Sequence, residues 1–164
     1  MAPDRPDAVV LDLDGVLADT RHRMHHLARG DKDWDGFFAA AVDDPVHPEG
    51  LAVATESAGR GMTLVYLSGR PERTRADTLG WLARYDVPPG EVVLRREGDR
   101  RPAAVMKVGA LRRLAERYRL LVLVDDDPAV VRAVVAVGVV AEVVRADWQP
   151  RDDELDDAQR HGRT

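Results

Sequence analysis

The stretch VVLDLDGVLADT, residues 9–20, decides the fold class because an apolar run leads directly into two carboxylates. Residues 8–13 show no polar alternation, which is typical of a strand that is covered on both faces. Side chains alternate along a strand, so we expect Asp12 and Asp14 to point to the same side. Two like charges at such a short distance repel one another, and each loses hydration on burial. The pair therefore requires a positive group nearby or a shared proton.

Length and composition predict one domain without disulfides. The chain has 164 residues, of which 45% are hydrophobic, and we expect a single domain over 1–149 and a charged tail over 150–164. The formal net charge of −5 gives no general attraction to nucleic acid or anionic membrane, although a local basic groove is compatible with it. No cysteine is present, so thiolate chemistry is excluded. Without a signal-peptide pattern or a long apolar run, a cytoplasmic protein with no membrane partner is expected.

Strand and helix patterns alternate along the chain. Strands are predicted over 8–13, 62–67, 92–94, 120–124 and 139–144. Helices are predicted over 19–28, 33–42, 48–60, 70–85, 102–118 and 129–137. This order predicts an α/β fold with a doubly wound, mostly parallel sheet and helices on both faces.

Polar side chains follow three of these strands. Asp12 and Asp14 end the first, Ser68 the second, and an acidic pair, Asp125 and Asp126, the fourth. Ligands bind at the carboxyl edge of such sheets, so these groups form a candidate site. Strand ends are commonly polar, but that alternative explains one aspartate per strand and not several that converge.

The chemistry of these groups favours a metal and a phosphate. Converging carboxylates suit Mg²⁺, which completes its shell with water and substrate phosphate. Gly15 and Gly69 allow backbone N–H groups to approach an anion. Ser68, Arg70 and Lys107 can donate to phosphate oxygens. One aspartate can attack phosphorus as a nucleophile, and the second can move the proton.

In order, the motifs DLDGVL (12–17), LSGR (67–70), Lys107 and VDDDP (124–128) resemble those of the haloacid dehalogenase-like (HAD) phosphohydrolases. The resemblance covers residues 8–145. It implies Asp12 as nucleophile and Asp14 as general acid and base, with Ser68 and Lys107 holding the phosphoryl group. It also implies a Mg²⁺ site formed by Asp12, the backbone carbonyl of Asp14, and the Asp125/Asp126 pair. We expect Asp125 to be the direct ligand and Asp126 to lie farther from the metal, although the spacing does not decide between them.

Within that superfamily the chain looks most like the 3′-phosphatase domain of phage-type polynucleotide kinase/phosphatases. The motif SGRPERTR (68–75) places Arg70 where that family binds phosphate, and Arg23 lies nine residues after Asp14, where the family has a functional arginine. Arg21 is a rival for that role. The chain departs from the family at Ala103, where an acidic residue is usual, and at Asp127, where arginine is usual. It has no phosphate-binding loop of the kinase type.

The segment 16–60 is too short for a cap domain, so we expect a minimal flap and an open site that admits a large substrate. A lid supplied by a partner subunit is the alternative, and the sequence does not give the oligomeric state.

Three further features allow two interpretations each. Arg95, Arg96, Arg100 and Arg101 are either a groove for a nucleic acid backbone or a solvated loop. His22, His25 and His26 have the spacing of a metal site or line the flap. Trp34, Phe37 and Phe38 stack a base or pack the flap onto the body.

The sequence therefore predicts a Mg²⁺-dependent phosphatase that works through an aspartyl phosphate. Its preferred substrate is a nucleic acid end with a 3′-phosphate. A small-molecule phosphatase such as a nucleotidase is the enzymatic alternative. A receiver-like signalling domain or a phosphate-binding module without catalysis is the alternative outside enzymes. Motif order argues against a receiver, because Lys107 precedes the last acidic pair.

Overall fold

The computed structural model describes residues 4–28, 30–151, 156–157 and 160. Five strands form one sheet in the order β3-β2-β1-β4-β5, and every pairing is parallel. The strands are β1 (Asp7–Leu11), β2 (Thr63–Pro71), β3 (Glu91–Arg95), β4 (Arg119–Asp125) and β5 (Glu142–Arg145). The predicted doubly wound α/β class is confirmed, and the described sheet is parallel throughout.

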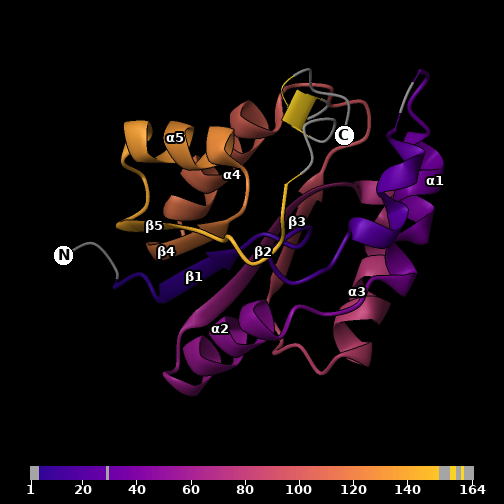
Figure 1. Cartoon of the computed structure of the whole chain (residues 1–164). Helices are drawn as coiled ribbons and strands as arrows, with labels where there is room; N and C mark the ends of the chain where they lie inside the picture. The colour runs from indigo at the N-terminus through magenta and orange to yellow at the C-terminus, as the bar shows by residue number, and fades with distance from the viewer. Residues whose placement is uncertain (1–3, 29, 152–155, 158–159, 161–164) are drawn as a thin grey trace.

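Helices cover both faces of the sheet (Figure 1). Helices α4 (Ala103–Ala115) and α5 (Pro128–Val137) lie on one face, and α2 (Pro48–Gly59) and α3 (Arg75–Arg84) lie on the other. Short elements follow β1 beyond the carboxyl edge of the sheet. They are the 3₁₀ helices η1 (Arg21–His26) and η2 (Ala40–Asp43), with α1 (Trp34–Ala39) between them.

Strand β1 shows why its sequence is apolar at every position. Ala8 and Val10 belong to the hydrophobic cluster beneath α4 and α5, whereas Val9 and Leu11 belong to the cluster on the opposite face. All four residues are buried. A central parallel strand that is covered twice has no solvent-facing position, so the alternation of polar and apolar residues disappears.

Several element boundaries differ from the prediction. Strand β1 ends at Leu11, so Asp12 and Leu13 lie beyond it. Strand β2 continues through Ser68 to Pro71, and the helix predicted from Arg70 begins at Arg75 after the 3₁₀ helix η3 (Glu72–Thr74). Proline favours an extended residue before it, which keeps Arg70 in the strand.

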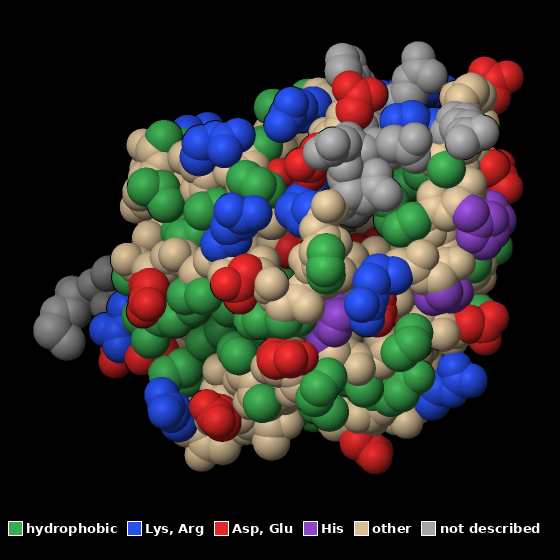
Figure 2. Space-filling view, viewed as in Figure 1, with side chains coloured by type: hydrophobic (Ala, Val, Ile, Leu, Met, Phe, Trp, Pro, Cys, Tyr) green, Lys and Arg blue, Asp and Glu red, His purple; other side chains and the backbone are tan. Residues whose placement is uncertain are grey.

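The segment predicted as a helix over 19–28 contains only η1, and the last strand begins at Glu142. The charged surface is mixed: Figure 2 shows basic and acidic side chains interspersed over this face, with neither sign gathered into one field. Within the described residues, no helix combines the length and the apolar character needed to cross a bilayer.

Candidate active site

Asp12 and Asp14 lie in two different ion-pair clusters, although both residues line one pocket. Their strand has ended at Leu11, and Gly15 turns the chain with a φ of +82°, so strand alternation no longer applies. The Lys107 ammonium lies 2.8 Å from Asp12. Asp14 instead contacts two guanidinium groups, at 2.8 Å from Arg23 and 2.7 Å from Arg70. Each carboxylate thus has the positive partner that its burial requires.

The first cluster is centred on Lys107, which α4 carries beneath the carboxyl ends of β1 and β4. Its Nζ lies 2.8 Å from Asp12 Oδ2 and 2.6 Å from Asp125 Oδ2. The second oxygens accept backbone N–H groups, that of Leu13 at 2.7 Å for Asp12 and that of Asp127 at 2.9 Å for Asp125. These bonds fix both carboxylates in orientation.

Burial dominates the ionisation of this cluster. It raises the pKa of Asp12 well above its usual range, although Lys107 acts in the opposite direction. Burial by itself would lower the pKa of Lys107, but the carboxylates of Asp12 and Asp125 outweigh it and raise that pKa. Lys107 is therefore a permanent cation at the bottom of the site.

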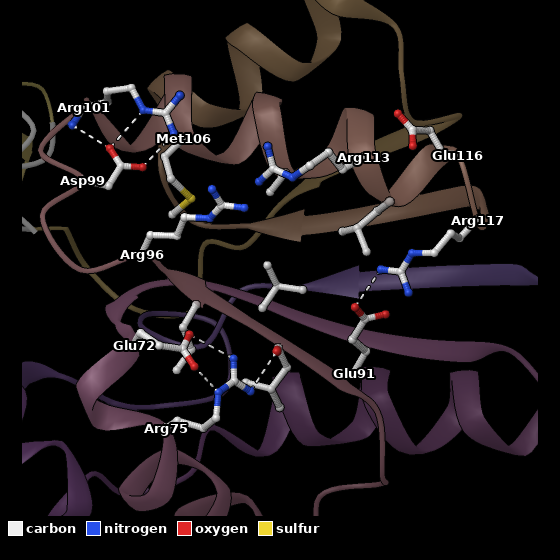
Figure 3. Close-up of a pocket in the computed structure, with 15 residues that line it drawn as sticks. Glu72, Arg75, Glu91, Arg96, Asp99, Arg101, Met106, Arg113, Glu116 and Arg117 are labelled. Carbon is white, nitrogen blue, oxygen red and sulfur yellow. Dashed lines mark hydrogen bonds and ion pairs between the residues drawn. The ribbon is translucent and has the colours of Figure 1, made fainter.

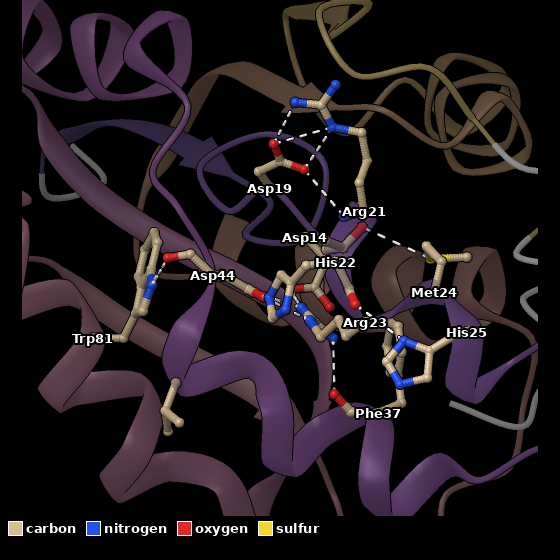
Figure 4. Close-up of polar contacts among 12 residues, drawn as sticks. Asp14, Asp19, Arg21, His22, Arg23, Met24, His25, Phe37, Asp44 and Trp81 are labelled. Carbon is tan, nitrogen blue, oxygen red and sulfur yellow. Dashed lines mark hydrogen bonds and ion pairs between the residues drawn. The ribbon is translucent and has the colours of Figure 1, made fainter.

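The second cluster is organised by Asp44, a residue that sequence analysis did not single out (Figure 4). Its carboxylate, fully buried, accepts from Arg23 Nε at 2.8 Å and Nη2 at 2.7 Å, and from Arg70 Nη2 at 3.1 Å. His22 Nε2 lies 2.7 Å from the same group. The Asp44 carbonyl accepts from Trp81 Nε1 at 2.8 Å. In the sequence nothing separates this aspartate from its neighbour Asp43, because the distinction arises only from folding.

Asp14 is ionised in this arrangement. Burial would raise its pKa, but the guanidinium groups of Arg23 and Arg70 outweigh burial and lower the pKa to about 2. Both arginines are themselves buried. Arg21 pairs with Asp19 on the surface, so Arg23 is the arginine of this region that enters the site.

The two clusters face a pocket of about 30 Å³, called here the inner pocket. Its lining combines residues of both clusters with aromatic side chains: Asp12, Asp14, Thr20, Phe37, Phe38, Ser68, Gly69, Arg70, Ala103 and Lys107. Ser68 is buried, and its Oγ accepts from the Arg70 backbone N–H at 3.2 Å, which leaves the hydroxyl proton available for a ligand. A small pocket with a lysine, an arginine and a serine in its wall suits a phosphoryl group rather than a whole substrate.

A divalent cation fits beside this pocket. Asp12, Asp125 and Asp126 each offer an oxygen, and these oxygens lie within 4.8 Å of one another. Asp126 Oδ1 is buried and accepts no hydrogen bond from the described chain, so it can serve as a metal ligand. Carboxylate oxygens are the donors that Mg²⁺ prefers. Burial also raises the pKa of Asp126 to about 7, and a bound cation would favour its ionised form.

The segment after residue 149, which the sequence analysis expected to be a charged tail, reaches this cluster. Arg151 Nη1 lies 2.5 Å from Asp126 Oδ2, and its Nη2 lies 3.9 Å from Asp127 Oδ1. Asp127, the departure noted in the last motif, caps α5 by accepting from the Ala129 N–H at 2.8 Å. Most of the remaining tail lies outside the described residues. Arg151 is a second residue that sequence analysis missed, since no motif precedes it.

The histidines do not gather around a metal position. His22 contacts Asp44, and His26 Nδ1 lies 3.1 Å from Asp33. His25 Nδ1 lies 3.1 Å from the His22 carbonyl. Among the described residues, the group with the geometry for a metal is the aspartate triad. The flap interpretation therefore describes the three histidines better than the metal interpretation.

The aromatic residues of α1 pack the flap segment and also reach the site. Phe37 and Phe38 are buried with Leu27, and Trp34 packs against them. The Arg23 guanidinium lies 4.2 Å from the centre of the Phe37 ring. These contacts are packing within the flap segment, since every residue of this cluster belongs to 16–60, and not packing of the flap onto the body.

A pocket of about 500 Å³ lies away from this chemistry, along β3 and α4 (Figure 3). Three of its acidic side chains have basic partners within its wall, in the pairs Glu72–Arg75, Glu91–Arg117 and Asp99–Arg101. None of the motif positions Asp12, Ser68 or Lys107 lines it. Size by itself therefore does not mark the site.

Comparisons with known proteins agree with this geometry. The family model described as the polynucleotide kinase PNKP phosphatase domain matches residues 6–147. None of the curated protein sequences compared with the chain matches it.

Solved structures share the fold. A chain of the Pnkp1/Rnl/Hen1 complex superposes with a TM-score of 0.72 at 23% identity, covering 90% of this chain and 47% of that one. The class C acid phosphatase from Bacillus anthracis gives a TM-score of 0.68 at 14% identity, covering 99% and 81%. The chain thus spans less than half the length of the matched chain in the Pnkp1/Rnl/Hen1 complex. By its match over residues 6–147, the chain belongs to the family of polynucleotide kinase PNKP phosphatase domains, within the HAD-like phosphatases.

Proposed function

We propose that this protein is a Mg²⁺-dependent phosphomonoester hydrolase that removes 3′-phosphates from nucleic acid ends. One observation carries the proposal: the buried Asp12 carboxylate, held by Lys107 at 2.8 Å, shares the inner pocket with Ser68, Arg70 and Asp14. A nucleophile, phosphate donors and a second carboxylate thus face one space. The nucleic acid substrate is proposed from family membership and from the similarity of this chain to a chain of the Pnkp1/Rnl/Hen1 RNA repair complex.

In the first half-reaction the Asp12 carboxylate attacks phosphorus, and the bond between phosphorus and the leaving oxygen breaks. Ser68 and Lys107 donate to the phosphoryl oxygens and hold them in place. Asp14 protonates the leaving alkoxide. Asp14 begins as a carboxylate, and the negative charge of an arriving phosphate favours its uptake of a proton.

In the second half-reaction Asp14, now a carboxylate, takes a proton from water as the water oxygen attacks the aspartyl phosphate. The bond between Asp12 and phosphorus breaks, which releases inorganic phosphate and restores the Asp12 carboxylate. Asp14 ends the step protonated, and it returns to the carboxylate by releasing that proton to solvent or to the next leaving group. Mg²⁺ bound by Asp12, Asp125, Asp126 and the Asp14 carbonyl would neutralise charge on the transferred group. The glycines Gly15 and Gly69 leave room for the backbone at that group.

The direct test is Mg²⁺-dependent phosphate release from a 3′-phosphorylated oligonucleotide, compared with its 5′-phosphorylated twin and with mononucleotides. We expect a preference for the 3′-phosphorylated end. Asp12→Asn is expected to abolish turnover and to leave the fold intact, as circular dichroism would show. Equal or faster release from mononucleotides would instead assign a small-molecule phosphatase. A phosphorylated protein that does not turn over would revive the receiver-like alternative.

A further inference from the structure

A second pocket lies beside the inner pocket and shares a wall with it. This outer pocket, of about 420 Å³, is lined by Trp34, Phe38, Pro71, Arg73, Arg95, Arg96, Glu97, Gly98, Asp99 and Arg100. Phe38 lines both pockets. Arg95 Nε donates to the carbonyl of Gly69, which lines the inner pocket, at 3.2 Å. A substrate whose phosphate fills the inner pocket therefore finds this space next to it.

Two residues that line the outer pocket each carry a buried donor without an acceptor among the described residues. In the described chain, three buried side-chain nitrogen or oxygen atoms lack a hydrogen-bond partner, and two of them, Arg95 Nη2 and Trp34 Nε1, belong to residues of this wall. Arg95 is only 1% exposed, and its other nitrogens donate to backbone carbonyls. Buried polar atoms without partners are rare in proteins. Since both atoms are donors, the missing partner is an acceptor.

The charge of the wall indicates an anionic acceptor. Four arginines and two carboxylates line the pocket. Both carboxylates already have arginine partners. Glu97 lies 3.2 Å from Arg73, and Asp99 lies 2.7 Å from Arg101, which is outside the pocket. Arg96 and Arg100 have no ion pair within the described part of the chain. The larger pocket of Figure 3 lacks this combination, because no unpartnered buried donor of the described residues belongs to its wall.

We infer that the outer pocket binds a phosphate of the leaving group, namely the phosphodiester that precedes the terminal 3′-phosphate of a nucleic acid strand. The inference rests on the proposed function and adds a substrate subsite to it. Arg95 Nη2 and Trp34 Nε1 donate to the phosphodiester oxygens, and Arg100 adds charge at the mouth. The volume lies within the range of small-ligand sites.

The test compares three substrates and three variants. The substrates are a nucleoside 3′-monophosphate, a nucleoside 3′,5′-bisphosphate and a short oligonucleotide with a 3′-phosphate. Trp34→Phe removes the unpartnered N–H and keeps an aromatic ring, Arg95→Lys keeps the charge, and Arg100→Gln alters an exposed side chain. Arg132→Gln on α5, away from the pocket, is the matched control for lost charge.

We expect the variants to raise KM for the oligonucleotide about tenfold and to leave KM for the nucleoside 3′-monophosphate unchanged. If the variants raise KM for the bisphosphate as much as for the oligonucleotide, the pocket binds any second phosphate. If KM for the bisphosphate does not change, the pocket requires the phosphodiester of a strand. Variants that change all three substrates equally, or none, would overturn the inference. Because Arg95 is buried, the Arg95→Lys variant risks misfolding. The Trp34→Phe and Arg100→Gln variants therefore decide whether the inference holds.

Binding of a product oligonucleotide with a 3′-hydroxyl, measured by fluorescence anisotropy, separates this inference from the proposed function. If the wild-type protein binds the product but releases no phosphate, and the variants bind the product more weakly, the proposed function is contradicted and the pocket is retained. Product binding that the variants do not weaken contradicts the pocket. The salt dependence of binding is expected to decrease in Arg100→Gln but not in Arg132→Gln.

Discussion

Asp44 illustrates how one residue can organise a site without a motif. It holds Arg23 and Arg70 through its carboxylate, and those arginines in turn hold Asp14. A guanidinium without a counter-charge is costly to bury, so the orientation of both arginines depends on this carboxylate. Asp44 is thus a positioning residue for the proposed general acid and base.

Asp44→Asn is expected to lower the free energy of unfolding by about 3 kcal/mol, because it leaves two buried arginines without this counter-charge. We also expect kcat for phosphate release to decrease by at least tenfold. Urea unfolding and steady-state kinetics check both effects. Asp43→Asn, at the neighbouring position, is the control. Equal behaviour of the two variants would contradict the positioning role.

Gly15 lies where a side chain cannot fit. A Cβ there would collide with Asp126 Oδ2, and the backbone has a φ of +82°. Gly61 has a similar φ of +76°, but a Cβ added to it would meet no atom within 4 Å. A Gly61→Ala variant therefore shows the effect of backbone strain without a collision. Gly61→Ala should lose about 1 kcal/mol of stability through backbone strain, and Gly15→Ala should lose more because the collision is added. Only Gly15→Ala is expected to lose activity and affinity for Mg²⁺, measured by calorimetry; retained affinity would contradict the placement of Asp126 in the metal site.

At the scale of elements, the segment between β3 and α4 is shaped by buried and paired charges rather than by an apolar core. Arg95 Nη1 donates to the Arg101 carbonyl at 2.8 Å, and Asp99 accepts from the Arg101 N–H at 3.0 Å. These bonds close the 96–101 loop over the outer pocket. The solvated-loop interpretation is thus wrong for Arg95, which is buried, although Arg100 remains exposed.

The Asp99 contacts predict a pH dependence of stability. Hydrogen bonds from Arg101 lower the pKa of Asp99 from 3.8 to about 2. A carboxylate with a lowered folded-state pKa stabilises the fold above the unfolded pKa, and this contribution is lost as the pH falls from about 4 towards 2. The difference in urea midpoint between wild type and Asp99→Asn should therefore shrink over that interval. A constant difference would show that Asp99 contributes no charge-dependent stability.

At the scale of the molecule, the two clusters join distant parts of the chain at one edge of the sheet. Lys107 of α4 bridges the residues that follow β1 and end β4, and Arg151 bonds the loop after β4. A cation bound by the aspartate triad would link the same segments, namely the residues that follow β1 and those at the end of β4. Metal binding to the folded state would therefore contribute to overall stability.

Addition of Mg²⁺ should raise the midpoint of thermal unfolding, with about 2.7 kcal/mol of stabilisation at a hundredfold excess over Kd. Asp126→Asn should abolish this increase because it removes one negatively charged oxygen ligand. Asp147→Asn, an exposed change of the same charge, should retain it. Chelation by EDTA should return the wild-type midpoint to its starting value. An increase that persists in Asp126→Asn would place the metal elsewhere.

The amino-acid sequence determined the fold class and the edge of the sheet where the site lies. Apolar strands such as 8–11 are covered twice and therefore read as continuous runs, and polar residues at their carboxyl ends meet because parallel strands align. Boundaries were less predictable where tertiary contacts prevailed. Ser68–Pro71 remains extended because Pro71 disfavours a helical residue before it and because Pro71 pairs with Arg95 of β3, a partner that local sequence does not indicate.

Only the tertiary structure decided which charge meets which. The sequence contains the aspartates and arginines, but a buried charge is stabilised by the neighbour that the fold brings to it, not by the neighbour in the chain. Asp12 thus meets Lys107 while Asp14 meets Arg23 and Arg70, and Asp44 enters the site from a separate loop. The sequence offered Arg95, Arg96 and Arg100 as a groove for a nucleic acid backbone, but it could not reveal the unpartnered donor of Arg95, which exists only once folding has buried that side chain.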